Sequence, residues 1–354
     1  MCCPRSGSCR GFCAAEAGDF TRRGYLNGRF DLTGIEGLAD LLQAETGAQR
    51  RQALRQYGGA ARETYTAWRK RIIAMRAEIE ANLDFIDEED IPADIGENVA
   101  GKAAELAGEI ARHLADDRRG ERLRSGVRVA VLGPPNAGKS SLLNALAHRD
   151  VAIVTEEAGT TRDVIEVALD LGGYPLTIAD TAGMRETEGL VEKEGIRRAL
   201  REGREADLVL WMWDGAEAMP PLPGDVRDGG ADIWRVRNKM DLTVDSDAER
   251  SGTADFRLSV KTGEGLDRLT DALETYAAEA CGRGEPVLIT RERHREGLVA
   301  CRAALLRAGE HGVDRLELVA EELRSAGDAL GRIVGKVDVE DLLDVIFSEF
   351  CIGK

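Results

Sequence analysis

The sequence predicts an α/β domain, with a mostly parallel sheet and helices on both faces, inserted into an all-α helical domain. Two patterns support this fold class. Apolar residues recur at helical spacing in 31–125 and again in 291–354, whereas short apolar runs alternate with helical segments from 127 to 281. Such alternation is typical of parallel strands joined by crossover helices. We therefore expect the two helical halves to pack on each other around an inserted α/β domain.

The first helical half, 31–125, carries a long apolar stripe. Its members recur at steps of three and four residues, which places them on one face of a helix: Trp68, Ile72, Met75, Ile79, Leu83 and Ile86. Leu106, Ile110 and Leu114 continue the spacing in a second helix. A stripe of this kind forms core far more often than a cofactor-binding surface, so we assign it to the core.

The α/β domain, 126–282, follows as a series of short apolar runs. They predict six strands, at 127–132, 164–171, 174–180, 207–213, 232–237 and 255–259. Between the fourth and fifth strands the segment GAEAMPPLPGDVRDGG is short and rich in Pro and Gly, which predicts a loop in place of a crossover helix. The second helical half, 283–354, ends in a helix whose apolar face carries Leu342, Leu343, Ile346, Phe347 and Phe350.

The charge composition of the chain limits the kinds of partner that it can bind. The chain of 354 residues has 48 basic and 64 acidic side chains, a net charge of −16. That charge is unfavourable for non-specific binding to a phosphate backbone, so a nucleic acid must be met through a local patch or through another protein. We find no apolar run of membrane-spanning length and no charged-then-apolar leader, and we expect a cytoplasmic protein without a membrane segment.

The loop Gly133-Pro-Pro-Asn-Ala-Gly-Lys-Ser140 separates the first predicted strand from the helical run SLLNALA. In this setting the backbone N–H groups of the loop turn toward a phosphate chain, and the positive N-terminal end of the helix also attracts it. Lys139 supplies a charge for the β- and γ-phosphates, and the Ser140 hydroxyl ligates Mg²⁺. The alternative is an ordinary Gly-rich turn, against which the complete spacing argues. The predicted nucleotide contacts here are Asn136, Ala137, Gly138, Lys139, Ser140 and Ser141.

Two further segments are suited to the γ-phosphate and Mg²⁺. In Ala158-Gly-Thr-Thr-Arg-Asp163 the Thr161 hydroxyl completes the Mg²⁺ shell when a γ-phosphate draws the loop inward. Asp180-Thr-Ala-Gly183 ends a predicted strand, which places Asp180 near the Mg²⁺ shell and the Gly183 N–H beside the γ-phosphate. Alone, the second segment is a weak match, and an ordinary strand-to-turn transition is its alternative. The predicted contacts are Ala158, Gly159, Thr160, Thr161, Asp180, Thr181, Ala182 and Gly183.

Two later segments select the base. In Asn238-Lys-Met-Asp241 the Asp241 carboxylate accepts hydrogen bonds from the guanine N1–H and exocyclic amine, and Asn238 meets the other edge. Adenine would leave those groups unpaired. Ser259, Val260 and Lys261 are expected to close over the base, with Lys239 beside it. Together with the phosphate loop, the order and spacing of these elements predict a P-loop GTPase domain that binds GTP and Mg²⁺.

The motifs GPPNAGKSSLLNAL, VTEEAGTTRD, IADTAGMRE, NKMD, LSVKTGEG and the terminal FCIGK together resemble the MnmE (TrmE) family of tRNA-modification GTPases. The resemblance runs from AEAGDFTRRGYLNGRFDL to the end of the chain, and the terminal FCIGK discriminates best between this family and related GTPases. It implies a GTP hydrolase stimulated by K⁺ in place of an arginine finger, with G domains that dimerise across their nucleotide faces. The implied K⁺ ligands are Asn136, otherwise a polar turn residue, and the loop residues Thr155, Glu157 and Thr160, with Glu156 in the same nucleotide-binding loop.

The resemblance also implies the catalytic residue. Met184 follows the DTAG segment, and its apolar side chain cannot orient the attacking water. By resemblance that role passes to Glu192, acting through a bridging water. From the residues alone, Glu192 is one of many surface glutamates.

In the family, hydrolysis supports an FAD-dependent partner of the MnmG (GidA) type, which attaches a carboxymethylaminomethyl-type group at C5 of the tRNA wobble uridine. The resemblance implies that tRNA is met mainly through this complex and that a tetrahydrofolate derivative supplies the one-carbon unit. Arg29 and Lys354 match folate contacts, and Cys351 matches the thiol that the modification needs. The alternative for Cys351 is a buried small apolar residue on the last helix.

The N-terminus departs from the family pattern. Only about residues 14–30 match the N-terminal folate-binding and dimerising domain, and MCCPRSGSCRGFCA fits nothing expected there. We therefore expect 1–30 to be a remnant of that domain, through truncation or a misplaced start. Folate binding and constitutive dimerisation depend on the missing part, whereas GTP chemistry does not. Two alternative functions stay open: a GTP-gated RNA or ribosome assembly switch, and a truncated GTPase without modification activity.

Overall fold

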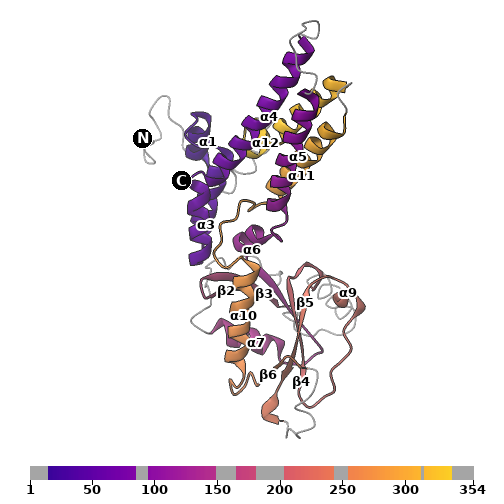
Figure 1. The fold of residues 1–354 in the computed structure, drawn as a ribbon. Coiled ribbons are helices and arrows are strands. Elements are labelled where there is room, and N and C mark those ends of the chain that lie inside the picture. Colours follow the sequence, from indigo (N-terminus) through magenta and orange to yellow (C-terminus); the bar gives the residue numbers. More distant parts are fainter. Residues whose placement is uncertain are drawn as a thin grey trace, which may run out of the picture. The chain divides into compact units, whose positions relative to one another are not determined.

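The computed structural model describes residues 15–84, 95–148, 165–180, 203–242, 254–311 and 315–336. The chain divides into two compact units (Figure 1). The helical unit comprises Met1–Ala44, Arg50–Glu121 and Pro286–Lys354, and the sheet unit comprises Glu45–Gln49 and Arg122–Glu285. Within the described ranges, no helix is both long and apolar enough to cross a membrane.

The helical unit is built around four long helices: α4 (Ala60–Asp84), α5 (Ile95–Leu114), α11 (Glu292–Glu310) and α12 (Leu316–Val334). Helix α11 packs against α5 and α12, and α12 packs against α4, so segments far apart in the sequence form one bundle (Figure 1). Shorter helices complete the described part of the unit: α1 (Asp19–Leu26), α2 (Leu32–Gln43) and most of α3 (Gly47–Tyr57). Helix α6 (Arg119–Ser125) spans the boundary between the two units.

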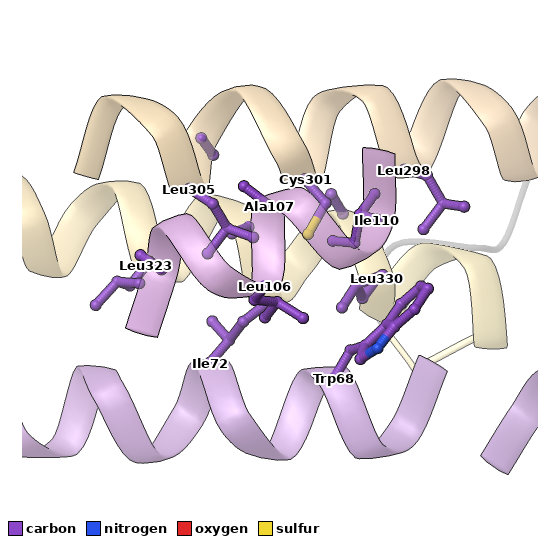
Figure 2. Close-up of a cluster of buried hydrophobic side chains, with 14 of the residues drawn as sticks. Trp68, Ile72, Leu106, Ala107, Ile110, Leu298, Cys301, Leu305, Leu323 and Leu330 are labelled. Carbon is purple, nitrogen blue, oxygen red and sulfur yellow. The ribbon is translucent and has the colours of Figure 1, made fainter. Parts of the chain in front are cut away.

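The core of the bundle is the predicted apolar stripe and its partners. Trp68, Ile72, Met75 and Ile79 are buried along α4 and meet Leu106 and Ile110 of α5. Figure 2 shows Trp68, Ile72, Leu106 and Ile110 together with members from the other two helices, which include Leu298, Leu305, Leu323 and Leu330. Leu83 and Leu114 are partly buried at the margin of the core, and Ile86 lies outside the described residues. The two helical halves therefore share one core, as the sequence predicts.

A buried ionic cluster joins α2 to the start of α11. Both oxygens of the Glu36 carboxylate contact the Arg293 guanidinium, with Nε–Oε1 at 2.6 Å, and Oε2 lies 2.9 Å from Nε2 of His294. Burial by itself would raise the pKa of Glu36, but the interactions with His294 and Arg293 outweigh it and hold that pKa well below its usual range. Burial lowers the pKa of His294, so the neutral imidazole donates its Nε2–H to the carboxylate.

The sheet unit contains a six-stranded sheet in the order β2-β3-β1-β4-β5-β6. The strands are β1 (Val127–Leu132), β2 (Ile165–Leu171), β3 (Tyr174–Asp180), β4 (Leu208–Asp214), β5 (Asp232–Asn238) and β6 (Phe256–Arg257). Strands β2 and β3 are antiparallel, and the remaining neighbours are parallel. β1 and β4 are buried along nearly their whole length because both faces of the sheet are covered, which explains their continuous apolar sequence.

Helices α7 (Lys139–Ala147) and α10 (Leu266–Ala280) both contact β2 and β3. Over β4, a second apolar cluster forms between strand residues such as Trp211 and Trp213 and the Pro/Gly-rich segment predicted as a loop. That segment contains one helical turn, α9 (Gly224–Arg227), whose Val226 is fully buried in the cluster. The Trp211 indole also donates to the Pro220 carbonyl at 3.2 Å. The remaining described element of the unit is the 3₁₀ turn η1 (Met240–Leu242).

Candidate nucleotide-binding site

The phosphate loop lies between the carboxyl end of β1 and the start of α7, at the edge of a parallel sheet where α/β folds bind ligands. The loop needs glycine at both ends, because atoms of neighbouring strands occupy the space where a Cβ would lie. Gly133 has φ of 149°, and a Cβ there would lie 1.9 Å from the Met212 carbonyl oxygen of β4. Gly138 has φ of 98°, and a Cβ there would lie 2.3 Å from Nδ2 of Asn238. The sequence thus permits a loop pressed against two neighbouring strands.

Lys139 and Ser140 occupy the first turn of α7, next to the loop. The Lys139 ammonium donates to the carbonyl oxygens of Gly133 at 2.9 Å and Pro134 at 2.8 Å, which holds the positive charge over the loop. Gly138 is the N-cap of α7 and supplies no side-chain cap, so the first N–H groups of the helix point toward the loop. A positive helix end, an ammonium and exposed backbone form a site suited to a phosphate chain.

The Ser140 hydroxyl is an oxygen donor of the kind that suits a hard divalent cation beside such a phosphate. The Ser140 side chain is exposed at the start of α7, and Asp180 ends β3, where its neighbour in the sheet is Val131 of β1. Hydroxyl and carboxylate oxygens are the ligands that Mg²⁺ prefers, with phosphate oxygens completing the shell. Asn136, at the tip of the loop, is exposed and has φ of 62°.

Asn238 connects the phosphate loop to the predicted base-binding segment. It ends β5 with 2% of its surface exposed. Its Nδ2 donates to the Ala137 carbonyl at 2.8 Å, and its Oδ1 accepts from the Val260 N–H at 3.1 Å. The amide has a second N–H, so contact between Asn238 and the base stays a prediction. The observed bonds of this side chain connect the loop before α7 to the segment that contains Val260.

Asp241 is exposed in η1, and its carboxylate is oriented by a buried neighbour. The Ser259 hydroxyl donates to Asp241 Oδ1 at 2.6 Å, and its own oxygen accepts from the Thr262 N–H at 3.2 Å. Ser259 is fully buried, so this arrangement is fixed by the fold. The second carboxylate oxygen and the remaining lone pairs can accept hydrogen bonds from a purine edge. Sequence reasoning placed Ser259 over the base but missed its part in positioning Asp241.

Asp214 is a second residue that sequence reasoning missed. It ends β4 opposite Asn238 in the register of β4 and β5, and its Oδ2 lies 2.7 Å from the Lys239 ammonium. The hydrogen bond from Lys239, followed by the Ala216 N–H, lowers the pKa of Asp214. Lys239 has φ of 60°, so its side chain is directed by a left-handed backbone as well as by this ion pair. An acidic residue at the carboxyl end of the apolar run LVLWMW was the available signal.

The structure thus brings the phosphate loop, Asp180, Asn238, Lys239, Asp241 and Ser259 to the carboxyl ends of β1, β3, β5 and β6 and the segments that follow. Ser141, Val260 and Lys261 lie in the same segments, with Lys261 exposed. Arg29 is exposed just after α1 and belongs to the helical unit. The other predicted site residues lie outside the described residues: Thr155, Glu156, Glu157, Ala158, Gly159, Thr160, Thr161, Thr181, Ala182, Gly183, Glu192, Cys351 and Lys354.

Comparison with known proteins gives related sequences along nearly the whole chain. The family model described as the MnmE helical domain matches residues 32–351. The protein named tRNA modification GTPase MnmE in Rhodopseudomonas palustris is 52% identical over 342 residues, covering 96% of this chain and 76% of that protein. Its namesake in Rhodospirillum rubrum is 52% identical over 355 residues, covering 98% and 76%.

Solved structures match part of the chain. Era of Aquifex aeolicus, in a structure with GDP and AlF₄⁻, is 24% identical, covers 50% of this chain and 66% of its own, and has a TM-score of 0.35. The G domain of the T. maritima iron transporter FeoB is 27% identical, covers 43% of this chain and 98% of its own, and has a TM-score of 0.31.

Proposed function

This chain belongs to the MnmE family of tRNA-modification GTPases and is a GTP hydrolase that acts in tRNA modification, and we propose how its residues divide that work. The phosphate loop and Lys139 hold the β- and γ-phosphates, while Ser140 and Thr161 hold Mg²⁺. Asp180 lies beside that shell. The cation neutralises charge on the phosphate oxygens and orients them for attack by water.

Guanine selection is proposed to rest on the Ser259–Asp241 pair. The hydroxyl-to-carboxylate distance of 2.6 Å is the observation that carries the proposal, because it fixes an exposed acceptor where a base can reach it. Guanine presents two N–H donors to a carboxylate, whereas adenine presents an acceptor at the corresponding ring nitrogen. Asn238 supports the selection, since its bonds to Ala137 and Val260 tie the base subsite to the phosphate loop.

We propose that K⁺ stimulates hydrolysis at the same loop. Asn136 is exposed at the loop tip and offers an amide oxygen, and backbone oxygens of Thr155, Glu157 and Thr160 are proposed to complete the shell. A cation there would place positive charge where negative charge develops in the transition state. Glu192 is proposed to orient the attacking water. Dimerisation of G domains across their nucleotide faces would enclose this site.

We propose that GTP hydrolysis serves the same purpose in this chain as in the rest of the family. Residues 126–282 are assigned as the G domain, 31–125 and 283–354 as the halves of the helical domain, and 1–30 as a remnant of an N-terminal folate-binding domain. A cycle of GTP binding and hydrolysis supports an FAD-dependent partner of the MnmG type in modifying C5 of the wobble uridine. Cys351 is proposed as the thiol that this modification needs, and Arg29 and Lys354 as contacts to a tetrahydrofolate derivative.

The test of base selection compares GTP with ATP in the unmodified protein and in Asp241→Asn. An asparagine amide presents a donor to the guanine N1–H, so we expect GTP affinity to fall by about a hundredfold or more. Asp271→Asn removes one exposed carboxylate from α10, away from the site, and should leave GTP affinity unchanged. Equal affinity for GTP and ATP in the unmodified protein, or an Asp241→Asn variant that binds GTP normally, would contradict the proposal.

A further inference from the structure

Helix α3 is strongly basic in a chain that is acidic overall. Its sequence, GAQRRQALRQY, carries Arg50, Arg51 and Arg55 and has no acidic residue. Between residues 45 and 76 there are eight basic and two acidic side chains, whereas the net charge of the whole chain is −16. Basic residues therefore outnumber acidic ones in α3 and the first part of α4, two neighbouring helices in the sequence (Figure 1).

One face of α3 is fixed against the helical unit. The buried side chain of Gln52 donates to the Val287 carbonyl at 2.9 Å. Gln56, also buried, donates to the Thr33 carbonyl at 3.3 Å and accepts from the Thr290 hydroxyl at 2.9 Å. These bonds reach α2 and the segment before α11, so the helix cannot rotate freely about its axis. The opposite face is consequently presented in a fixed orientation.

That opposite face consists of Arg50, Arg51, Leu54 and Arg55, which are all exposed, and we refer to it as the α3 arginine face. The spacing of three and four residues places these side chains side by side on the helix surface. Arg51 and Arg55 are like charges at i and i+4, an arrangement that destabilises an isolated helix. At the end of the helix, Tyr57 is 39% exposed and Leu54 is 49% exposed.

Several other basic residues of the same unit are paired with acids. Arg71 contacts Glu109 at 2.6 Å, and Arg307 contacts Glu322 at 2.7 Å. By contrast, within the described part of the chain Arg50, Arg51 and the exposed Arg62 at the start of α4 form no ion pair. A solvated helix surface usually alternates in charge, as α12 does with Arg324 between Glu321 and Asp328. The α3 arginine face lacks such alternation.

We propose that the α3 arginine face binds the phosphodiester backbone of tRNA. The inference rests on the role of the chain in tRNA modification and adds the surface that meets the nucleic acid. Guanidinium groups bind phosphate oxygens through paired hydrogen bonds, and their release of counterions supplies most of the affinity. The acidic remainder of the chain repels the same polyanion, which favours one docking position. Leu54 and Tyr57 offer apolar and aromatic surface to ribose or to an unstacked base.

The experiment measures binding of fluorescently labelled tRNA to the full chain at several salt concentrations. Arg50→Gln/Arg51→Gln should weaken binding by about tenfold and reduce the slope of log K against log salt by about two, because each substitution takes one guanidinium away from a phosphate. Arg302→Gln/Lys336→Gln removes two exposed positive charges elsewhere in the helical unit and should change neither quantity. GTP hydrolysis, measured on the same samples, should be unchanged in both variants.

The proposed tRNA-binding surface and the proposed GTPase function can fail independently in this experiment. Absence of GTP hydrolysis in the unmodified protein would contradict the proposed function and leave the binding titration to judge the surface. Unchanged tRNA affinity and salt slope in Arg50→Gln/Arg51→Gln, equal losses in both double variants, or no tRNA binding by an active unmodified protein would overturn the α3 arginine face. A parallel titration with polyglutamate tests an acidic protein as the partner. Loss of polyglutamate binding with normal tRNA binding would also overturn it.

Discussion

At the scale of single residues, burial sets the charge state of His294. Its side chain is completely buried beside Glu36, and burial lowers the pKa of His294 although the carboxylate opposes that effect. Arg293 and Arg291 add positive charge nearby, which further disfavours an imidazolium. In the unfolded chain the same ring titrates near its ordinary pKa of about 6.5. The folded state therefore binds fewer protons than the unfolded state once the pH falls below that value.

We expect the free energy of unfolding to fall as pH is lowered from about 7 toward 5, by up to about 1.4 kcal/mol per pH unit from this group. Folding stability linked to a lowered pKa is present above the unfolded pKa and is lost as the pH decreases. His294→Gln keeps an N–H donor for Glu36 but does not titrate, so its stability should depend less on pH in this range. Urea unfolding at three pH values measures the difference, with His311→Gln as the control. The same dependence of the free energy of unfolding on pH in the unmodified protein and in His294→Gln would contradict a neutral, buried His294.

Single residues of the site differ in how well the sequence predicts them. Lys139, Ser140 and Asp241 stand at fixed spacing in short motifs, because a phosphate chain and a base demand particular groups at particular places. Asp214 and the buried hydrogen bond of Ser259 depend on which strands are neighbours. Pairing of β4 with β5 brings Asp214 to Lys239 across 25 residues of sequence, and no local pattern encodes that contact.

At the scale of elements, the strand bounds follow from burial. β1 and β3 occupy the predicted residues, and β5 extends one residue beyond its predicted end. β4 is shifted by one residue toward the C-terminus at both ends, and β2 is described from Ile165, one residue after its predicted start. β6 is shorter than predicted because the chain leaves the sheet to form the loop after it, where the Ser259 N–H bonds to the Glu264 carbonyl. The turn α9 was not predicted, since Pro223 and Gly224 obscure a helical turn that tertiary packing of Val226 stabilises.

Helix α4 offers a direct test of its two faces. Ile72 is 1% exposed and packs in the core shown in Figure 2, whereas the adjacent Ile73 is 47% exposed. Ile72→Ala should lower the free energy of unfolding by about 2–5 kcal/mol, because it removes buried methyl groups and leaves a cavity. Ile73→Ala should change it by about 0.5 kcal/mol or less. Urea unfolding of both variants gives the comparison, and equal losses would show that the helix does not bury the face described.

At the scale of the whole molecule, the chain leaves the helical unit after Glu121 and returns to it at Pro286. The change of sequence pattern places the proposed limits of the insertion at 126 and 283. The predicted limit at 126 differs from the unit boundary, which falls inside α6 between Glu121 and Arg122. Glu121 pairs with Arg295, and Arg122 pairs with Asp207. Such a boundary inside a helix leaves no compositional signal. The assignment of Glu45–Gln49 to the sheet unit is likewise a tertiary effect, since Ala48 bonds to Gly173.

We propose that this molecule hydrolyses GTP with K⁺ bound at the phosphate loop. Single-turnover GTP hydrolysis in KCl and in NaCl at equal ionic strength tests it most directly, using the unmodified protein, Asn136→Ala and Glu192→Ala. We predict several-fold faster hydrolysis in KCl for the unmodified protein, no difference between the salts for Asn136→Ala, and no hydrolysis with near-normal GTP affinity for Glu192→Ala. Equal rates in KCl and NaCl for the unmodified protein would contradict the claim.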